Sequence, residues 1–243
     1  MINVSKGLDL PISGSPAIKI SDEPKISSVA VLSNDFVGMK PTMFVKANDK
    51  VKVGQKIFED KKNPGVYFTS PAGGTVKSIN RGAKRRFLSI EIDIDANEEY
   101  ELFNLGTTTN EIKTALLDSG LWNGFRTRPF NRTPKVDDNA DAVFINCCDT
   151  NPLSVDPYEI IKEDKSLFDE GIKILSKLFD CEIHLTYQNN RFDTSNKDIN
   201  YHHVSGPHPA GLSSTHISKI YPVSLKRIVW TINYQDIISI GYL

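Results

Sequence analysis

The sequence lacks the long apolar runs and leader patterns of membrane and secreted proteins. No apolar run approaches the roughly 18–20 residues that a membrane-spanning helix needs. The first residues also lack the apolar core of a signal peptide. We therefore expect a cytosolic protein or a peripheral component of a complex, with no transmembrane segment.

Cysteine is scarce as well. Cys147, Cys148 and Cys181 are an odd number in a long chain and have no Cys-x-x-Cys spacing. This usage indicates neither a disulfide framework nor a structural zinc site. The histidines near residue 208 add ligand types to a metal hypothesis but no ligand spacing, so we expect no metal.

An excess of charge of either sign is also missing. The 29 Lys and Arg residues nearly balance the 30 Asp and Glu residues, which argues against a protein that mainly binds nucleic acid. A length of 243 residues favours two domains, since single cores are commonly built from about 100–150 residues.

Residues 203–217, which we call the organising loop, have the most distinctive local sequence pattern of the chain. Two prolines flank His208 and two glycines flank the prolines, a pattern that predicts a rigid loop and excludes a helix or central strand. Residues 213–215 offer a helix N-cap, so a short helix is expected to start at His216. The loop either presents His208 to a ligand or is a fixed turn whose histidine is satisfied by nearby carbonyls.

The first half reads as a small β domain. Short apolar segments alternate with turn residues, which predicts a compact antiparallel or barrel-like sandwich. The expected strands are residues 28–32, 43–46, 55–59, 66–70, 75–80 and 87–95.

Part of this domain resembles biotinyl/lipoyl carrier domains, on residues 51–55, 58–61 and 70–76. That likeness implies the fold, and an acylated lysine at Lys61 or Lys62. The alternative is that these adjacent turn lysines are merely solvated.

Two loops of the first half are candidate binding sites. Phe36 and Met39 lie beside Gly38 after the first strand, where they either cover a flat apolar ligand or belong to the core. Residues 81–86 hold four cations in a turn between two strands, which is typical of a charged hairpin tip and, as an alternative, of a nucleic-acid patch.

From about residue 106 the pattern changes to that of an α/β domain. A helix capped by Thr109 or Asn110 is expected to stop at Gly120. Residues 121–135 then combine cations with aromatic rings, which suits an anionic or planar ligand, or a contact between subunits or domains.

Buried strands alternate with helices in the rest of the chain. Alternation of this kind implies a sheet with at least one parallel crossover, covered by helices. The expected strands are residues 141–146 and 182–187, and the expected helices are residues 157–164 and 166–179. The first of these strands delivers Cys147 to Pro152 at its carboxyl end, where open α/β sheets place ligand sites.

Sequence words along the whole chain resemble the A-subunit family of the sodium-translocating NADH:quinone oxidoreductases. They run in family order, at residues 6–11, 37–43, 58–66, 80–85, 118–130, 149–153, 206–212 and 234–236. Because members of that family continue past residue 243, we expect this chain to be an N-terminal portion.

The resemblance implies the fold class and domains. A biotinyl/lipoyl-like β barrel-sandwich domain with an N-terminal extension is expected over residues 1–105. A Rossmann-like α/β domain, distantly related to the flavin subunit of respiratory complex I, is expected over residues 106–243. Trp122 and Asn123 stand where those distant relatives have glycines next to flavin phosphate, so we do not expect FMN here.

The resemblance also implies the function. It is that of a peripheral subunit on the cytoplasmic face of the bacterial inner membrane, in a complex that oxidises NADH, reduces ubiquinone and exports sodium. No cofactor is expected on this chain; FMN, FAD, riboflavin and an iron–sulfur centre belong to partner subunits. The main expected partner is the flavin-carrying membrane subunit, which is the B subunit of the complex.

The expected role of this chain is to receive quinone and support assembly, with no catalytic residue of its own. Apolar side chains would pack on the ring or tail, and a cation or histidine would donate to a carbonyl. The candidate quinone residues are Phe36, Gly38, Met39, Trp122, Arg128, Phe130 and His208. The alternatives are a purely structural role in assembly, a carrier domain acylated on lysine, and a flavoprotein.

Overall fold

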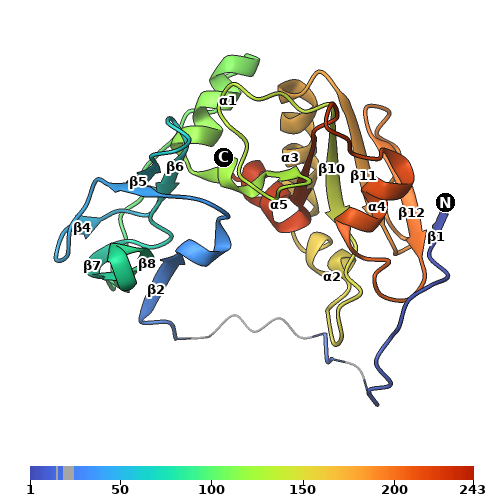
Figure 1. Cartoon of the computed structure of the whole chain (residues 1–243), viewed down its shortest axis with the longest axis horizontal. Coiled ribbons are helices and arrows are strands. Elements are labelled where there is room, and N and C mark those ends of the chain that lie inside the picture. The colour runs from blue at the N-terminus through green and yellow to red at the C-terminus, as the bar shows by residue number, and fades with distance from the viewer. Residues whose placement is uncertain (15, 19–24) are drawn as a thin grey trace. The chain divides into compact units, whose positions relative to one another are not determined.

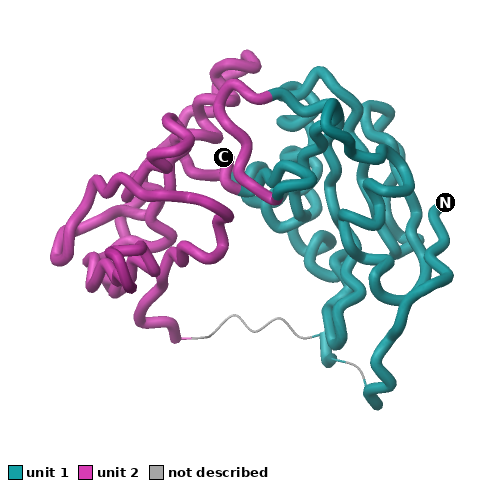
Figure 2. Tube along the Cα trace, viewed as in Figure 1, with its two compact units in different colours: residues 1–20, 124–130, 139–242 teal, residues 21–123, 131–138, 243 magenta. Residues whose placement is uncertain are grey.

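Packing in the computed structural model, which describes residues 1–14, 16–18 and 25–243, divides the chain into two interleaved units (Figure 2). The α/β unit contains residues 1–20, 124–130 and 139–242, and the β unit contains residues 21–123 and 131–138. The amino-terminal residues therefore pack with the second half of the chain. The predicted domain boundary after residue 105 stays a prediction.

The β unit holds two antiparallel sheets (Figure 1). Six of the seven strands lie within about three residues of an expected strand, which confirms the antiparallel sandwich, whereas the short strand Lys50–Val51 was not predicted. The four-stranded sheet has the order β2 (Ser28–Leu32), β8 (Phe87–Ile94), β7 (Gly74–Arg81), β4 (Lys50–Val51). The three-stranded sheet has the order β3 (Pro41–Met43), β5 (Lys56–Asp60), β6 (Tyr67–Thr69), and the 3-10 turns are η1 (Ser33–Asp35) and η2 (Ala83–Arg85).

Aromatic and branched side chains fill the β unit. Phe58 stacks on Phe68 with ring centroids 4.5 Å apart, and Val76, Ile90 and Ile92 are fully buried. Such alternating strands leave their other side chains to solvent. The sandwich therefore has one apolar centre between its sheets.

One helix, α1 (Thr109–Asp118), and the turn η3 (Leu121–Gly124) follow the strands of the β unit. The N-cap is Thr108, one residue before the predicted cap, because its hydroxyl accepts from Glu111 N–H while the Glu111 carboxylate accepts from Thr108 N–H. Gly120, with φ +79°, follows the helix as expected.

The α/β unit is built on one six-stranded sheet (Figure 1). All neighbours pair in parallel except β9, which is antiparallel to β13. The predicted parallel crossover is thereby confirmed. The order is β1 (Ile2–Asn3), β12 (Asn200–Ser205), β11 (Glu182–Tyr187), β10 (Ala142–Cys147), β13 (Val229–Asn233), β9 (Arg126–Arg128).

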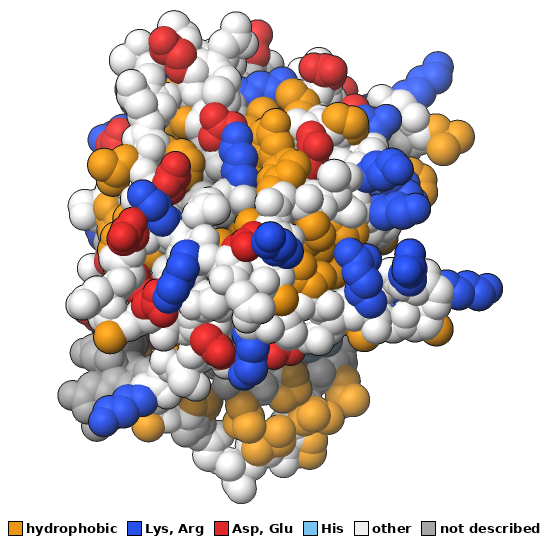
Figure 3. Space-filling model, turned by 90° about the vertical axis from the view of Figure 1, so that its left-hand side faces the viewer, with side chains coloured by type: hydrophobic (Ala, Val, Ile, Leu, Met, Phe, Trp, Pro, Cys, Tyr) orange, Lys and Arg blue, Asp and Glu red, His pale blue; other side chains and the backbone are white. Residues whose placement is uncertain are grey.

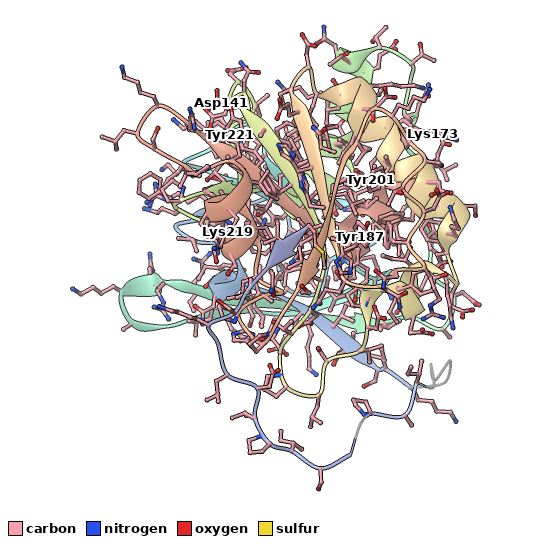
Figure 4. The ribbon with its side chains drawn as sticks, turned by 90° about the vertical axis from the view of Figure 1, so that its right-hand side faces the viewer. Asp141, Lys173, Tyr187, Tyr201, Lys219 and Tyr221 are labelled. Carbon is pink, nitrogen blue, oxygen red and sulfur yellow. The ribbon has the colours of Figure 1, made fainter. Side chains whose placement is uncertain are left out.

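Helices cover this sheet. The helices are α2 (Pro157–Ile161), α3 (Lys165–Leu178), α4 (Ser213–Ile220) and α5 (Tyr234–Gly241). On the α4 face, Ile217 joins Ala142, Phe144 and Val229 in one buried cluster, and Figure 4 shows α3 on the opposite side of the sheet from α4. Helices α3 and α5 pack so closely that a Cβ on Gly171 would lie 2.1 Å from the Ile237 carbonyl oxygen.

Two predictions around the organising loop are wrong. Helix α4 begins at Ser213 rather than His216, because the Leu212 carbonyl accepts from the N–H groups of Thr215 and His216. Strand β12 includes residues 203–205, which were predicted as loop, since pairing with β11 and β1 draws this polar segment into the sheet.

Within the residues that the structure describes, no helix combines the length and the apolar character needed to cross a bilayer. Over the same residues, no group of three or more His, Cys, Asp or Glu side chains is arranged to hold a metal ion.

Candidate functional site

The loop that carries His208 lies at the carboxyl end of the parallel sheet, directly after β12. Gly206 begins it with φ +120°, and a Cβ at that position would lie 2.0 Å from the Val4 carbonyl oxygen. Only glycine fits such an approach of two backbones. The loop is therefore held against the amino-terminal segment, as well as by its own prolines.

Hydrogen bonds fix His208 from two directions. Its backbone N–H donates to Asp9 Oδ1 at 2.9 Å, and its carbonyl accepts from the Leu8 N–H at 2.9 Å. Its ring Nδ1 lies 3.1 Å from Thr150 Oγ1. The partners come from two other segments of the chain, and Asp9 is 199 positions away from His208.

Thr150 is the hydrogen-bond partner of that ring. Its hydroxyl accepts from the Gly211 N–H at 2.9 Å and can give its single hydrogen to His208 Nδ1. When the hydroxyl donates in this way, Nε2 of the neutral ring carries the hydrogen. Nε2–H is then the donor that the half-buried ring offers to a ligand.

A hollow of about 530 Å³ is lined by this histidine. Its volume falls in the range of about 300–1,000 Å³ that small-molecule sites have. Apolar side chains form much of its wall, with hydroxyl and amide groups at one side. The lining residues are Leu8, Asp9, Leu10, Ile12, Gly14, Pro16, residues 150–154 and His208.

The cysteines beside this hollow are not activated. Burial raises the pKa of the Cys148 thiol to about 12, and burial also raises that of Cys147 well above its usual range. Thiols of this kind stay protonated at neutral pH and are poor nucleophiles and poor metal ligands. Neither thiol is therefore suited to nucleophilic or metal-binding chemistry beside the hollow.

The predicted Phe36 group lies in the β unit. Phe36, Gly38 and Met39 line a second hollow of about 120 Å³. The Phe36 ring meets Phe68 edge-on with centroids 4.6 Å apart. The remaining lining is largely polar and charged, from Val37, Asp60, Lys62, Asn63, Arg132, Thr133 and Lys135.

The predicted carrier lysines lie at the β5–β6 turn of the same unit. Lys61 and Lys62 are exposed. The adjacent Asn63 is buried, and its side-chain amide donates to the Pro134 carbonyl at 3.0 Å. This turn is therefore tied down on one side rather than projecting freely, and acylation at either lysine stays an untested alternative.

Trp122 lies in the interior of the β unit. It is 2% exposed, and its indole N–H donates to the Pro134 carbonyl at 3.0 Å. Contact with a quinone would require this packing to open. Phe130, by contrast, is 68% exposed.

Arg128 lies in the α/β unit, at the other end of the sheet from His208. It pairs with Val229, the first residue of β13, and lines a hollow of about 310 Å³ with Pro129, Ile217 and Pro222. Burial lowers the pKa of its guanidinium. One small ring cannot touch both Arg128 and His208, because β13 alone spans roughly 13 Å.

The structure thus brings Phe36, Gly38 and Met39 together around one hollow, whereas His208 and Arg128 each line another. Sequence reasoning missed Asp9 and Thr150 as partners of His208. Both lie in segments that carry the family resemblance, residues 6–11 and 149–153, but nothing in the residues assigns them to a histidine far along the chain.

Comparisons with known proteins cover nearly the whole chain. The model of the NqrA N-terminal barrel-sandwich hybrid domain matches residues 2–95, and that of the NqrA second alpha/beta domain matches residues 107–243. These matches confirm the predicted fold class.

Curated relatives agree with the domain matches. The chain is 44% identical over 250 residues to the A subunit of the Na(+)-translocating NADH-quinone reductase of Vibrio atlanticus. It is 47% identical over 253 residues to the protein of the same name from Neisseria meningitidis serogroup B, and 44% over 252 residues to that from Haemophilus influenzae. Each alignment covers 100% of this chain and 56% of the relative, so the chain spans about half the length of the curated relatives it matches.

Proposed function

The chain belongs to the NqrA family, the A subunits of Na(+)-translocating NADH-quinone reductases, and on this premise we propose that it acts as a peripheral part of such a respiratory complex. Its role is to bind ubiquinone and to support assembly at the cytoplasmic face of the bacterial inner membrane. The complex oxidises NADH, reduces ubiquinone and transports sodium.

The observation that carries the quinone part of this proposal is the hollow at His208. A quinone is a flat apolar ring with two carbonyl acceptors, so its site needs an apolar wall and a positioned donor. Leu8, Leu10 and Ile12 supply the wall, and the Nε2–H of His208 supplies the donor. A histidine is also suited to proton delivery, because its usual pKa is close to neutral.

The Phe36 hollow is the smaller candidate within the same proposal. Its volume of about 120 Å³ is below the usual range for a whole ligand. Phe36 and Met39 would therefore contact part of a ring or tail, with a partner protein completing the site. Trp122, Arg128 and Phe130 stay as predicted contacts that this hollow does not include.

Electron carriers are assigned to partner subunits in this proposal. Trp122 fills part of the core near the loop where the distant flavoprotein relatives place glycines, and the cysteine thiols beside His208 have raised pKa values. FMN, FAD, riboflavin and the iron–sulfur centre would be held by the other subunits. The flavin-carrying membrane protein of the complex, its B subunit, would be the direct neighbour.

The test is a calorimetric titration that measures the binding of a short-chain ubiquinone to the purified chain. His208→Leu, which has no hydrogen-bond donor, should weaken binding by roughly 5- to 10-fold, which is the loss of about one neutral hydrogen bond. His203→Leu is the matched control, since His203 lies on the neighbouring β12 and its Nε2 contacts the Gln188 carbonyl at 3.0 Å outside the hollow.

Equal affinity of the wild-type chain and the His208→Leu variant would reject the His208 site. If Phe36→Ala alone weakens binding and leaves thermal unfolding unchanged, the quinone binds in the β unit. If neither variant matters, the same titration in the assembled complex decides whether a partner supplies the site.

A purely structural assembly role is the second candidate. Large apolar side chains are exposed in the α/β unit, including Phe130 at 68% and Leu153 at 57%, as is common at contacts between subunits. This role predicts tight binding to the membrane partner with no affinity for quinone. Intact mass spectrometry tests the carrier alternative, which requires an added group on Lys61 or Lys62.

A further inference from the structure

The β7–β8 hairpin of the β unit ends in an exposed basic tip. Its two strands are eight residues long. Arg81 at the end of β7 and Lys84, Arg85 and Arg86 in the turn are all exposed. Figure 3 shows Lys and Arg side chains gathered on the lobe that projects at the right, and Figure 4 shows the η2 turn projecting at the left from the opposite direction.

Charge pairing differs between the two ends of this hairpin. Nearer its base, Lys77 pairs with Asp93 at 3.3 Å and Lys50 of the adjoining β4 pairs with Asp95 at 2.6 Å. At the tip, among residues 1–14, 16–18 and 25–243, no carboxylate lies within ion-pair distance of the four cations. The positive charge of the tip is therefore not compensated locally.

Two of the cations occupy turn positions whose backbone conformation favours asparagine and glycine. Lys84 and Arg85 have φ values of 55° and 60°, and the Arg86 N–H donates to the Ala83 carbonyl at 3.2 Å. This is the geometry of a type I′ turn, which favours Asn-Gly. Long side chains in the left-handed region cost conformational energy, so the sequence holds positive charge at the tip against the preference of the turn.

A small apolar element accompanies the charge. Leu88 is 37% exposed and packs beside Gly82, where a Cβ would lie 3.4 Å from its methyl groups. Residues 81–86 contain no aromatic ring, and single-stranded nucleic acids are commonly bound by aromatic side chains that stack on bases. The tip also projects beyond the sheet (Figure 4), which suits a broad anionic surface better than a groove.

We propose that the tip of the β7–β8 hairpin rests on an anionic phospholipid surface. The four cations lie among the lipid head groups, and Leu88 enters the boundary between head groups and acyl chains. Clustered Lys and Arg residues together with one apolar contact make a reversible anchor, since stable membrane anchoring takes two signals. This inference does not depend on the quinone site.

The test is sedimentation of the full chain with vesicles of phosphatidylcholine, and with vesicles of phosphatidylcholine and phosphatidylglycerol in equal parts. Lys84→Asn combined with Arg85→Gly removes two cations and installs the residues that the turn prefers, so folding is preserved. With about fivefold per cation, binding to the anionic vesicles should fall ~25-fold.

Lys50→Gln combined with Lys77→Gln is the matched control, because it removes the same charge from paired lysines nearer the base of the hairpin. This control should bind as the wild-type chain does. Three results overturn the proposal: no preference for anionic vesicles, an unchanged tip variant, or an equal loss in both variants. An equal loss in both variants would indicate a response to net charge alone. No preference for anionic vesicles would be the result if the tip binds an acidic protein instead.

Discussion

The His208 loop of the α/β unit and the Phe36 loop of the β unit each contain a glycine with positive φ, yet their surroundings differ. At Gly206 an added Cβ would lie 2.0 Å from a backbone oxygen, whereas at Gly38 the nearest atom is Arg132 Nε at 3.9 Å. The first loop is in close backbone contact with the amino-terminal segment. The second is held by the turn from Met39 N–H to the Phe36 carbonyl at 3.3 Å, by the packing of Phe36 on Phe68 and by the bond from Lys40 N–H to Asp60 Oδ1 at 3.0 Å.

The contrast bears on where the proposed quinone site would be preorganised. A ligand that binds an enclosed loop meets side chains that are already fixed, so little conformational entropy is lost on binding. His208 is fixed in this way by Asp9, Leu8 and Thr150. The Phe36 loop has more open space at its glycine and lines a smaller hollow.

The largest expected effect is that of Gly206→Ala. The new methyl group collides with the Val4 carbonyl, and the residue must also keep φ +120°, so the free energy of unfolding should fall by on the order of 3–5 kcal/mol. Denaturant unfolding followed by the fluorescence of Trp230, in a Trp122→Phe background, measures it in the α/β unit. A loss below about 1 kcal/mol would show that β1 and the loop are not held together.

Thr150→Val should have the next largest effect. Valine leaves the Gly211 N–H without its acceptor and His208 Nδ1 without its partner, at a cost of about 1–3 kcal/mol in the free energy of unfolding. Thr150→Ser keeps the hydroxyl and is the control. If valine and serine are equal in stability and in quinone affinity, the hydroxyl does not position His208.

The stability of the α/β unit should depend on pH through its buried histidines. Burial lowers the pKa values of His184, His202 and His216, all in the α/β unit. A lowered pKa in the folded state means that the unfolded chain binds protons first. The free energy of unfolding should therefore fall as the pH drops below about 6.5, the usual histidine value.

Denaturant titrations at about pH 7.5 and about pH 5.5, on either side of the ordinary histidine pKa, measure this loss. His202→Gln should reduce the difference, because it removes one of the three groups and the 3.1 Å contact between His184 Nδ1 and His202 Nε2. An α/β unit that is equally stable at both values would contradict the lowered pKa values.

The smallest expected effect is that of Gly38→Ala. The added methyl group has room, so only the strain of φ +79° remains, about 1 kcal/mol in the free energy of unfolding. The measurement is thermal unfolding of the variant beside that of the wild-type chain. A loss as large as that of Gly206→Ala would remove the contrast between the two loops.

Much of the fold could be predicted because apolar patterns mark buried strands. Residues 28–32 and 182–187 were predicted with the bounds observed for β2 and β11. Strand β12 could not be, since Asn200, His202 and His203 give no apolar alternation and pair only because β11 and β1 lie beside them. The start of α4 was misplaced because its first N–H groups use a backbone carbonyl rather than a serine cap.

The candidate site was predictable only in part. The glycines and prolines around His208 predicted a shaped loop, and the end of β10 predicted a ligand edge, but the bond to Asp9 joins residues 199 positions apart. No local pattern contains a contact of that separation. Trp122 shows the converse, since an aromatic ring in a cation-rich loop looks available in sequence and is buried in the structure.

Strand β1 has a consequence for how the polypeptide is made. Ile2 pairs with Val204, so a segment that leaves the ribosome early finds its neighbour only after some two hundred further residues have been synthesised. By then the strands of the β unit have all been synthesised and can pair with one another, whereas the residues of β1 still lack a neighbouring strand. A bulky group attached directly before residue 1 should therefore disturb the pairing of β1 with β12 more than the assembly of the sandwich.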